Sequence, residues 1–160
     1  MLVFKESLSS FAIGRRANSE EWNTITRTFE AADDVTLLKF GAPAVAGTGA
    51  HTCIECPATT AQNFLGVVEA VPVLPRPGDG FIRYDNVPLC DMGVIAVETE
   101  GNTTRGAQAR WNTATRKWTA AAQSATVVTI PGCQFEETAT APGVSTIRVR
   151  RPVPAATVSG

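Results

Sequence analysis

Short segments in which apolar and polar residues alternate recur along the chain, and turn-forming residues separate each segment from the next. In TITRTFEA, Ile25 and Phe29 share one side of an extended chain and the threonines share the other. Glycine and proline clusters, such as the one at 75–80, mark the turns. The pattern predicts strands within 24–31, 36–45, 51–56, 63–74, 80–90, 93–101, 126–135 and 144–151, and a hairpin at 109–119.

This spacing predicts an all-β fold: a single small sandwich or barrel-like domain of about eight or nine short antiparallel strands. The chain holds 20 threonines and 16 valines, a bias that favours strands. A length of 160 residues suits one domain. We assign residues 1–22 to an extended N-terminal arm, 23–152 to the β-domain and 153–160 to a C-terminal tail. The arm has no clean period, and its apolar residues pack either on a neighbouring chain or on their own domain.

The segment HTCIEC (51–56) holds the single histidine and two of the four cysteines. If it is extended, His51, Cys53 and Glu55 share one face and Cys56 points to the other. Three residues of strand separate the two cysteine Cα atoms by roughly 10 Å, which is too far for a disulfide. A redox pair would need a helix N-terminus, and a zinc site would need a second closely spaced ligand pair, which isolated Cys90 and Cys133 do not supply. We therefore expect buried free thiols and no metal or other cofactor.

This sequence offers only weak matches to the residue patterns that are typical of catalytic sites. His51 is the only imidazole and has no nucleophile elbow to pair with. Glu98 and Glu100 would share a strand face, but they stand beside the Gly101-Asn102 turn, where solvated charge is the ordinary explanation. The glycines of GAPAVAGTGA lack the lysine and the strand-loop-helix context of a phosphate-binding motif. We expect a protein that is not an enzyme.

The charge distribution argues against nucleic acid and membrane as partners. The formal net charge is −1 and the basic residues form only two small clusters, at 15–16 and 148–151, whereas proteins that bind nucleic acid usually carry a basic stripe. No apolar run approaches the roughly 20 residues that span a bilayer. The N-terminal segment is interrupted by Lys5 and Glu6, so we expect no secretory signal.

Three segments follow one another along the chain: NFLGVVEA (63–70), GVIAVETEGNTTRGAQARWNTATRKWT (93–119) and IPGCQFEETATAPGVSTIRVRRP (130–152). Their order resembles that in the head decoration, or cement, proteins of tailed bacteriophages. The resemblance covers roughly residues 36–152. The family often has a glycine before the aromatic residue of the hairpin, where this chain has Arg116 and Lys117.

The resemblance implies a structural protein of the virion, made in the host cytoplasm and placed on the outer surface of the capsid. It implies a homotrimer at three-fold and quasi-three-fold positions that bridges neighbouring major capsid proteins and stabilises the shell.

The candidate contact residues lie in and beside the arm, because interfaces favour aromatic residues and arginine at their centres. Trp111 and Trp118, by contrast, are expected to pair across the hairpin inside the core. The candidates for contact with the capsid or with a neighbouring subunit are Phe4, Phe11, Ile13, Arg15, Arg16 and Trp22.

A carbohydrate-binding or tail-associated β-module of a phage particle is the alternative, since tryptophans on such hairpins also stack on sugars. It requires an exposed Trp111 or Trp118. An enzyme on a trimeric β-fold is a third class, and it requires a cleft with titrating acids or His51.

Overall fold

The computed structural model describes residues 13–18, 21–59, 63–71 and 78–150. In these residues the secondary structure consists of strands and turns, without a helix, so the predicted all-β class is confirmed. No helix that could cross a membrane is present in the described ranges. The strands are β1 (Asn23–Phe29), β2 (Leu38–Lys39), β3 (Pro43–Ala46), β4 (Thr52–Glu55), β5 (Phe64–Val68), β6 (Gly80–Phe81), β7 (Asn86–Thr99), β8 (Gln108–Asn112), β9 (Lys117–Thr119), β10 (Val127–Phe135) and β11 (Gly143–Arg150).

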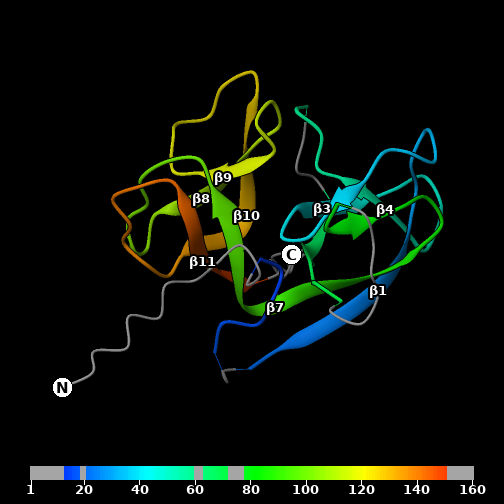
Figure 1. Cartoon of the computed structure of the whole chain (residues 1–160), viewed down its shortest axis with the longest axis horizontal. Coiled ribbons are helices and arrows are strands. Elements are labelled where there is room, and N and C mark those ends of the chain that lie inside the picture. Colours follow the sequence, from blue (N-terminus) through cyan, green and yellow to red (C-terminus); the bar gives the residue numbers. More distant parts are fainter. Residues whose placement is uncertain (1–12, 19–20, 60–62, 72–77, 151–160) are drawn as a thin grey trace, which may run out of the picture.

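Strand β7 is shared by two closed rings of hydrogen-bonded strands (Figure 1). Its first half pairs with β1 and β5, and strands β1, β4, β3, β5 and β7 close the first ring. Its second half pairs with β11 and, at Thr99, with β9, so that β7, β11, β10, β8 and β9 close the second ring. Closure leaves few unpaired strand edges, which are the sites where sheets aggregate.

A bend in β7 separates the two halves of the strand. Gly93 has φ +144°, a conformation that side chains rarely adopt, and a Cβ atom built there would lie 2.5 Å from Cε3 of Trp22. The register against β1 shifts at the same place, since Asn23 pairs with Met92 and Thr24 with Cys90. Glycine and a bulge therefore turn β7 from the first ring into the second.

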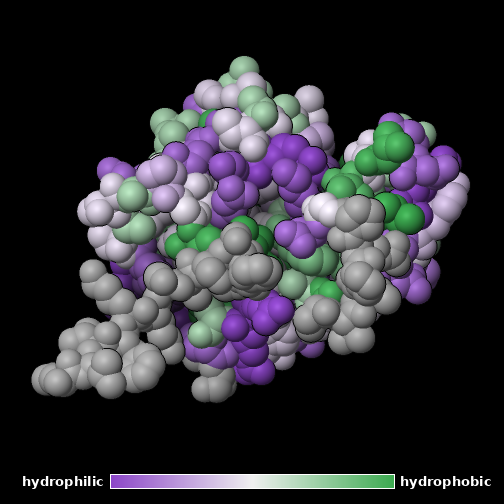
Figure 2. Space-filling view, in the orientation of Figure 1, coloured by the Kyte–Doolittle hydropathy of each residue, from purple (hydrophilic) through white to green (hydrophobic). Residues whose placement is uncertain are grey.

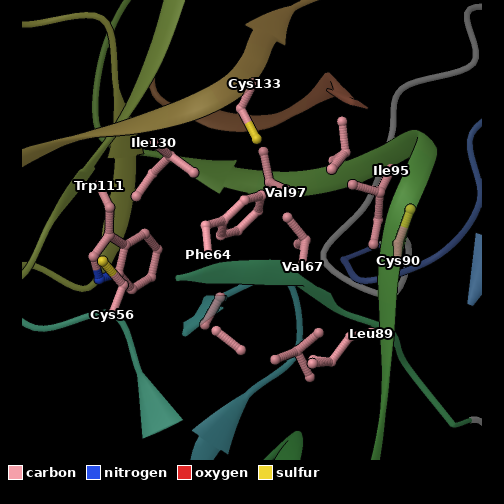
Figure 3. Packing of buried hydrophobic residues seen from close by; sticks show 14 of the residues in the cluster. Cys56, Phe64, Val67, Leu89, Cys90, Ile95, Val97, Trp111, Ile130 and Cys133 are labelled. Atoms are coloured by element: carbon pink, nitrogen blue, oxygen red, sulfur yellow. The ribbon is translucent and has the colours of Figure 1, made fainter. Parts of the chain in front are cut away.

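One hydrophobic core runs through both rings (Figure 3). Phe64 and Val67 of the first ring belong to the same buried cluster as Val97, Trp111 and Ile130 of the second. The two rings therefore share one packed core as well as β7.

The details differ from the expectation of eight or nine antiparallel strands. The structure has eleven strands in its described residues, and the pairs β1–β4 and β7–β9 are parallel. The predicted segments 80–90 and 93–101 are largely one strand, because the chain stays extended from Asn86 through Thr99. The segment 36–45 is instead divided into β2 and β3, since Gly41 has φ +76°.

Candidate functional site

The described part of the N-terminal arm pairs with the second half of β7. Gly14 donates its N–H to the carbonyl of Ala96 at 2.8 Å, Ala96 donates to Arg15 at 3.0 Å, and Ala17 donates to Val94 at 2.9 Å. Residues 13–18 therefore pack on their own domain, which is one of the two possibilities that the sequence left open. Phe4 and Phe11 lie outside the described residues.

The other four predicted contact residues divide into two groups. Ile13 packs on Gly41, and Trp22 is half-buried against the core, where it covers Gly93. Arg15 and Arg16 are exposed, and the guanidinium of Arg16 lies 5.6 Å from the ring centroid of Trp22. Among these four residues, Arg15 and Arg16 are the two whose side chains are exposed.

Two carboxylates lie where the arm, β1 and the bend of β7 meet. Glu69 accepts a hydrogen bond from Thr24 Oγ1 at 2.5 Å, and Asp91 accepts one from Asn23 Nδ2 at 2.6 Å. Burial raises the pKa of Glu69 above its ordinary value, the bond from Thr24 opposes that shift, and the charge of Asp91 adds to it. Each carboxylate holds β1 in place, which is a structural use of these acids.

The HTCIEC segment is strand β4 and its continuation. Cys53 and Cys56 are 0% and 2% exposed, His51 is exposed, and all four cysteines are free thiols. Burial raises the pKa of the Cys53, Cys56 and Cys90 thiols to about 12. No three His, Cys, Asp or Glu side chains gather as metal ligands would in the described part of the chain. The expectation of buried thiols is confirmed.

Trp111 and Trp118 face each other across the β8–β9 hairpin, as predicted. Their ring centroids lie 5.7 Å apart at an interplanar angle of 68°, and the residues are 2% and 0% exposed. Trp118 Nε1 also donates to the carbonyl of Gly41 at 2.7 Å. Neither ring can stack on a sugar, so the carbohydrate-binding alternative loses the residues on which it depended.

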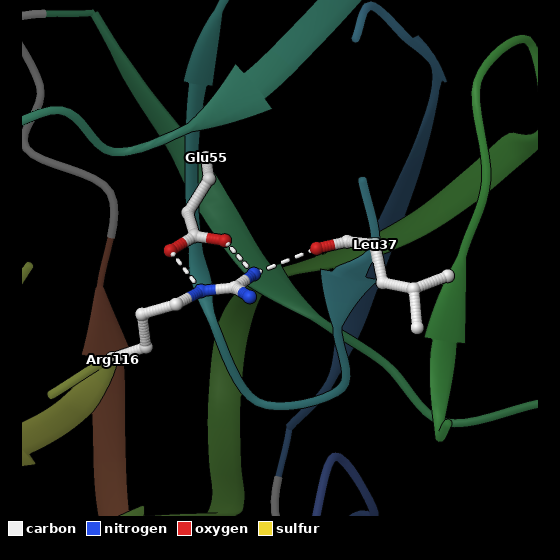
Figure 4. A network of polar contacts seen from close by, with 3 residues as sticks. All are labelled: Leu37, Glu55 and Arg116. Carbon is white, nitrogen blue, oxygen red and sulfur yellow. Dashed lines mark hydrogen bonds and ion pairs between the residues drawn. The ribbon is translucent and has the colours of Figure 1, made fainter. Parts of the chain in front are cut away.

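Arg116 joins the hairpin of the second ring to the first ring (Figure 4). Its guanidinium donates through Nε and Nη2 to both oxygens of Glu55, and Nη2 also donates to the carbonyl of Leu37. Its φ of +52° is the left-handed conformation that glycine adopts most easily. Arg116 therefore occupies a turn position that usually favours glycine. From this position its guanidinium forms a planar ion pair with Glu55 through two hydrogen bonds.

The two glutamates that the sequence placed on one strand face are both engaged. Glu98 pairs with Lys117 at 2.8 Å. Glu100 accepts from Asn112 Nδ2 at 3.0 Å and from Thr115 Oγ1 at 2.6 Å. Burial would raise the pKa of Glu100, but these hydrogen bonds outweigh it and lower the pKa. They fasten the hairpin turn.

Two loops at one end of the molecule expose large apolar side chains. Val35, between β1 and β2, is 84% exposed, and Tyr84, between β6 and β7, is 68% exposed. At the right-hand end in Figure 2, where Figure 1 shows the β1–β2 loop, hydrophobic residues reach the surface. The alternation pattern predicts a strand over 80–90, which hides the exposure of Tyr84, and it leaves Val35 in the turn before 36–45 without marking it as exposed. The turn residues Asp33-Asp34 and Asp85-Asn86 are the signal that flanks them.

The fold and these contacts define the class of protein: a small all-β protein whose polar side chains, in the described residues, largely fasten loops and strands. The chain matches the model of the structural cement protein family described by E217 gp24 and Pam3 gp6 over residues 4–150. It belongs to that family of phage structural proteins, which confirms the resemblance stated above.

A solved structure, "The capsid of Myoviridae Phage XM1", contains a chain of similar fold. The match has a TM-score of 0.68 at 15% sequence identity and covers 91% of this chain and 93% of the other. No curated protein matches the sequence. The protein is thus a cement protein of a phage capsid.

Proposed function

We propose that this cement protein binds the outer surface of the phage head as a homotrimer, bridges neighbouring major capsid proteins and reinforces the shell. The observation that carries the proposal is the family match over residues 4–150, together with a body in which two closed rings share one strand and one core. Such a body resists deformation when its partners move, as a reinforcing element must. Many copies on one lattice also compensate for modest single contacts through effective concentration.

The arm contributes to this binding in our proposal through Phe4, Phe11, Ile13, Arg15, Arg16 and Trp22. The exposure of Arg15 and Arg16 supports the role. Ile13 and Trp22 pack on their own domain, so in this proposal they contribute by holding the arm in position against the body.

The test is binding of the purified protein to undecorated heads of the phage that encodes it, followed by thermal disruption of decorated and undecorated heads. We expect saturable binding and a higher disruption temperature for decorated heads. Binding without a change in that temperature would contradict reinforcement, and absence of binding would contradict the whole proposal. The mass of the protein in solution and on heads tests the trimer.

A deletion of residues 2–12 tests the arm. This deletion keeps the pairing of residues 14–17 with β7, so the domain is expected to fold. We expect weaker binding to heads with an unchanged midpoint of thermal unfolding. Unchanged affinity would reject a role for Phe4 and Phe11, and the double variant Arg15→Ala, Arg16→Ala then tests the remaining arginines.

A further inference from the structure

The loop between β6 and β7 holds Tyr84 in a conformation that a tyrosine rarely adopts. Asp85 donates its N–H to the carbonyl of Ile82 at 3.1 Å, which closes a four-residue turn, and Tyr84 in the third position has φ +69°. Turns of this kind usually place glycine or asparagine there, because a side chain crowds the backbone. Packing within the domain does not account for the tyrosine, since it is 68% exposed. Such strain is concentrated at functional sites.

The turn fixes the backbone from which the tyrosine ring projects. Tyr84 donates its N–H to the carbonyl of the core residue Phe29 at 2.9 Å, and Asp85 Oδ2 accepts from the N–H of Ile82 at 2.9 Å. The guanidinium of Arg83 lies 4.7 Å from the ring centroid. Because the backbone of this turn is already held, only the side chain has to be ordered on binding, which lowers the entropic cost.

The neighbouring loop presents Val35 in a similar way. Asp33 Oδ1 accepts from the N–H groups of Val35 and Thr36 at 3.1 and 2.6 Å, and Arg83 lies 3.9 Å from Asp34. Val35 and Tyr84 are the large hydrophobic residues that the described part of the chain exposes. The two loops thus hold two apolar tips at one end of the molecule.

We propose that Tyr84 and Val35, with Arg83 beside them, are inserted into an apolar pocket of the major capsid protein that is bordered by a carboxylate. This inference rests on the proposed function and adds to the arm a second surface that contacts the major capsid protein. Tyrosine and arginine are the residue types that dominate binding energy at interfaces. Asp34 is 84% exposed and its contact with Arg83 is long, so a carboxylate of the partner competes with it readily.

The small size of this surface favours the major capsid protein, rather than a second copy of this chain, as the binding partner. A buried aromatic side chain covers about 150–250 Å², so one tyrosine, one valine and one arginine fall short of the roughly 800 Å² per partner that a stable pair of proteins buries. A contact of that size becomes strong only when many copies bind one lattice or when other contacts add to it. The head supplies both conditions.

The variant Tyr84→Gly separates binding from folding. Glycine adopts φ +69° without strain, so we expect an unchanged or higher unfolding midpoint, while the dissociation constant for undecorated heads rises about 30-fold, as for a hot-spot residue. Tyr84→Phe keeps the ring and is expected to keep most of the affinity. The matched control is Asn63→Gly, since Asn63 is exposed and has φ +61°; we expect unchanged binding.

The outcomes distinguish this inference from the proposed function. If the wild-type protein binds heads and Tyr84→Gly binds them equally well, the inference is wrong and the proposed function stands. If wild-type protein does not bind, both fall. If Tyr84→Gly loses self-association in sedimentation but keeps its affinity for heads, the occupant is a second copy, which overturns the assignment to the capsid protein.

Discussion

Arg116 shows how one residue can offset an unfavourable backbone by its side-chain contacts. A left-handed conformation costs a residue with a side chain about 1 kcal/mol relative to glycine. The arginine recovers more than this through its paired bonds to Glu55 and its bond to the carbonyl of Leu37. The pair also ties the hairpin to β4, so that it stabilises the contact between the two rings.

We expect Arg116→Ala to lower the free energy of unfolding by about 1–2 kcal/mol, measured by chemical denaturation. This figure lies below that for a fully buried pair because the side chains of Arg116 and Glu55 are 31% and 23% exposed. Arg116→Gly loses the same pair but relieves the backbone, so we expect it to lie between the wild type and the alanine variant. The control is Lys117→Ala, whose partner Glu98 is 41% exposed, with a loss below about 1 kcal/mol. An equal loss in the control would refute the role of the Arg116 pair.

Glu69 should make stability depend on pH. Its pKa in the folded state is raised above the ordinary value of 4.5, mainly by burial. Well below pH 4.5 the carboxyl group is protonated in both the folded and the unfolded state, so it contributes nothing to the pH dependence of stability. As pH rises above 4.5 the unfolded state loses the proton first, so the free energy of unfolding falls until the folded-state pKa is passed. We therefore expect Glu69→Gln to gain stability relative to the wild type across that window, measured by denaturation at several pH values.

A second variant checks the cause of this dependence. Thr24→Val removes the hydrogen bond that lowers the pKa of Glu69, so the loss of stability with rising pH should become larger. A Glu69→Gln variant whose stability tracks the wild type at every pH would contradict the explanation.

At the scale of elements, β7 is the strand on which the others depend. It pairs with β1, β5, β9 and β11 and with the segment at 14–17. The bend at Gly93 lets one strand serve both rings, and Trp22 fills the space that the missing side chain leaves. A change at this glycine therefore disturbs the bend and the packing of the arm together.

Gly93→Ala is expected to lower the free energy of unfolding by about 2–4 kcal/mol, the sum of backbone strain and overpacking against Trp22. Gly106→Ala is the matched control, because Gly106 also has positive φ, +82°, but a Cβ atom there meets nothing within 4 Å. Strain alone predicts a loss of about 1 kcal/mol in the control. Denaturation curves of the two variants measure the difference, and equal losses would show that Trp22 does not press on this position.

For the whole molecule, the shared strand and the common core predict that the two rings unfold together. We expect one calorimetric transition with equal calorimetric and van't Hoff enthalpies. Two resolved transitions would mean that the rings are independent, and the stiffness that the proposed reinforcement needs would then have to come from the capsid.

The sequence was sufficient for what depends on neighbours along the chain. Alternation placed Ile25 and Phe29 on the inner side of β1, the turn NTATRK paired Trp111 with Trp118, and the extended HTCIEC segment ruled out an internal disulfide. These features follow from strand periodicity and local steric preference, which a single segment carries by itself.

Tertiary structure alone decided which strands meet and which side chains stay outside. The parallel pairing of β1 with β4, the closure of two rings on β7 and the ion pair of Arg116 with Glu55 join residues that lie far apart in the chain. The alternation of apolar and polar residues shows that a strand has a buried face, but it does not show which other strands pack or pair with it. The order of the strands in the sheet was therefore not predictable. The exposure of Tyr84 was hidden for the same reason: a run of residues that looks like one strand breaks only because the carbonyl of Phe29 and the side chain of Asp85 hold its turn.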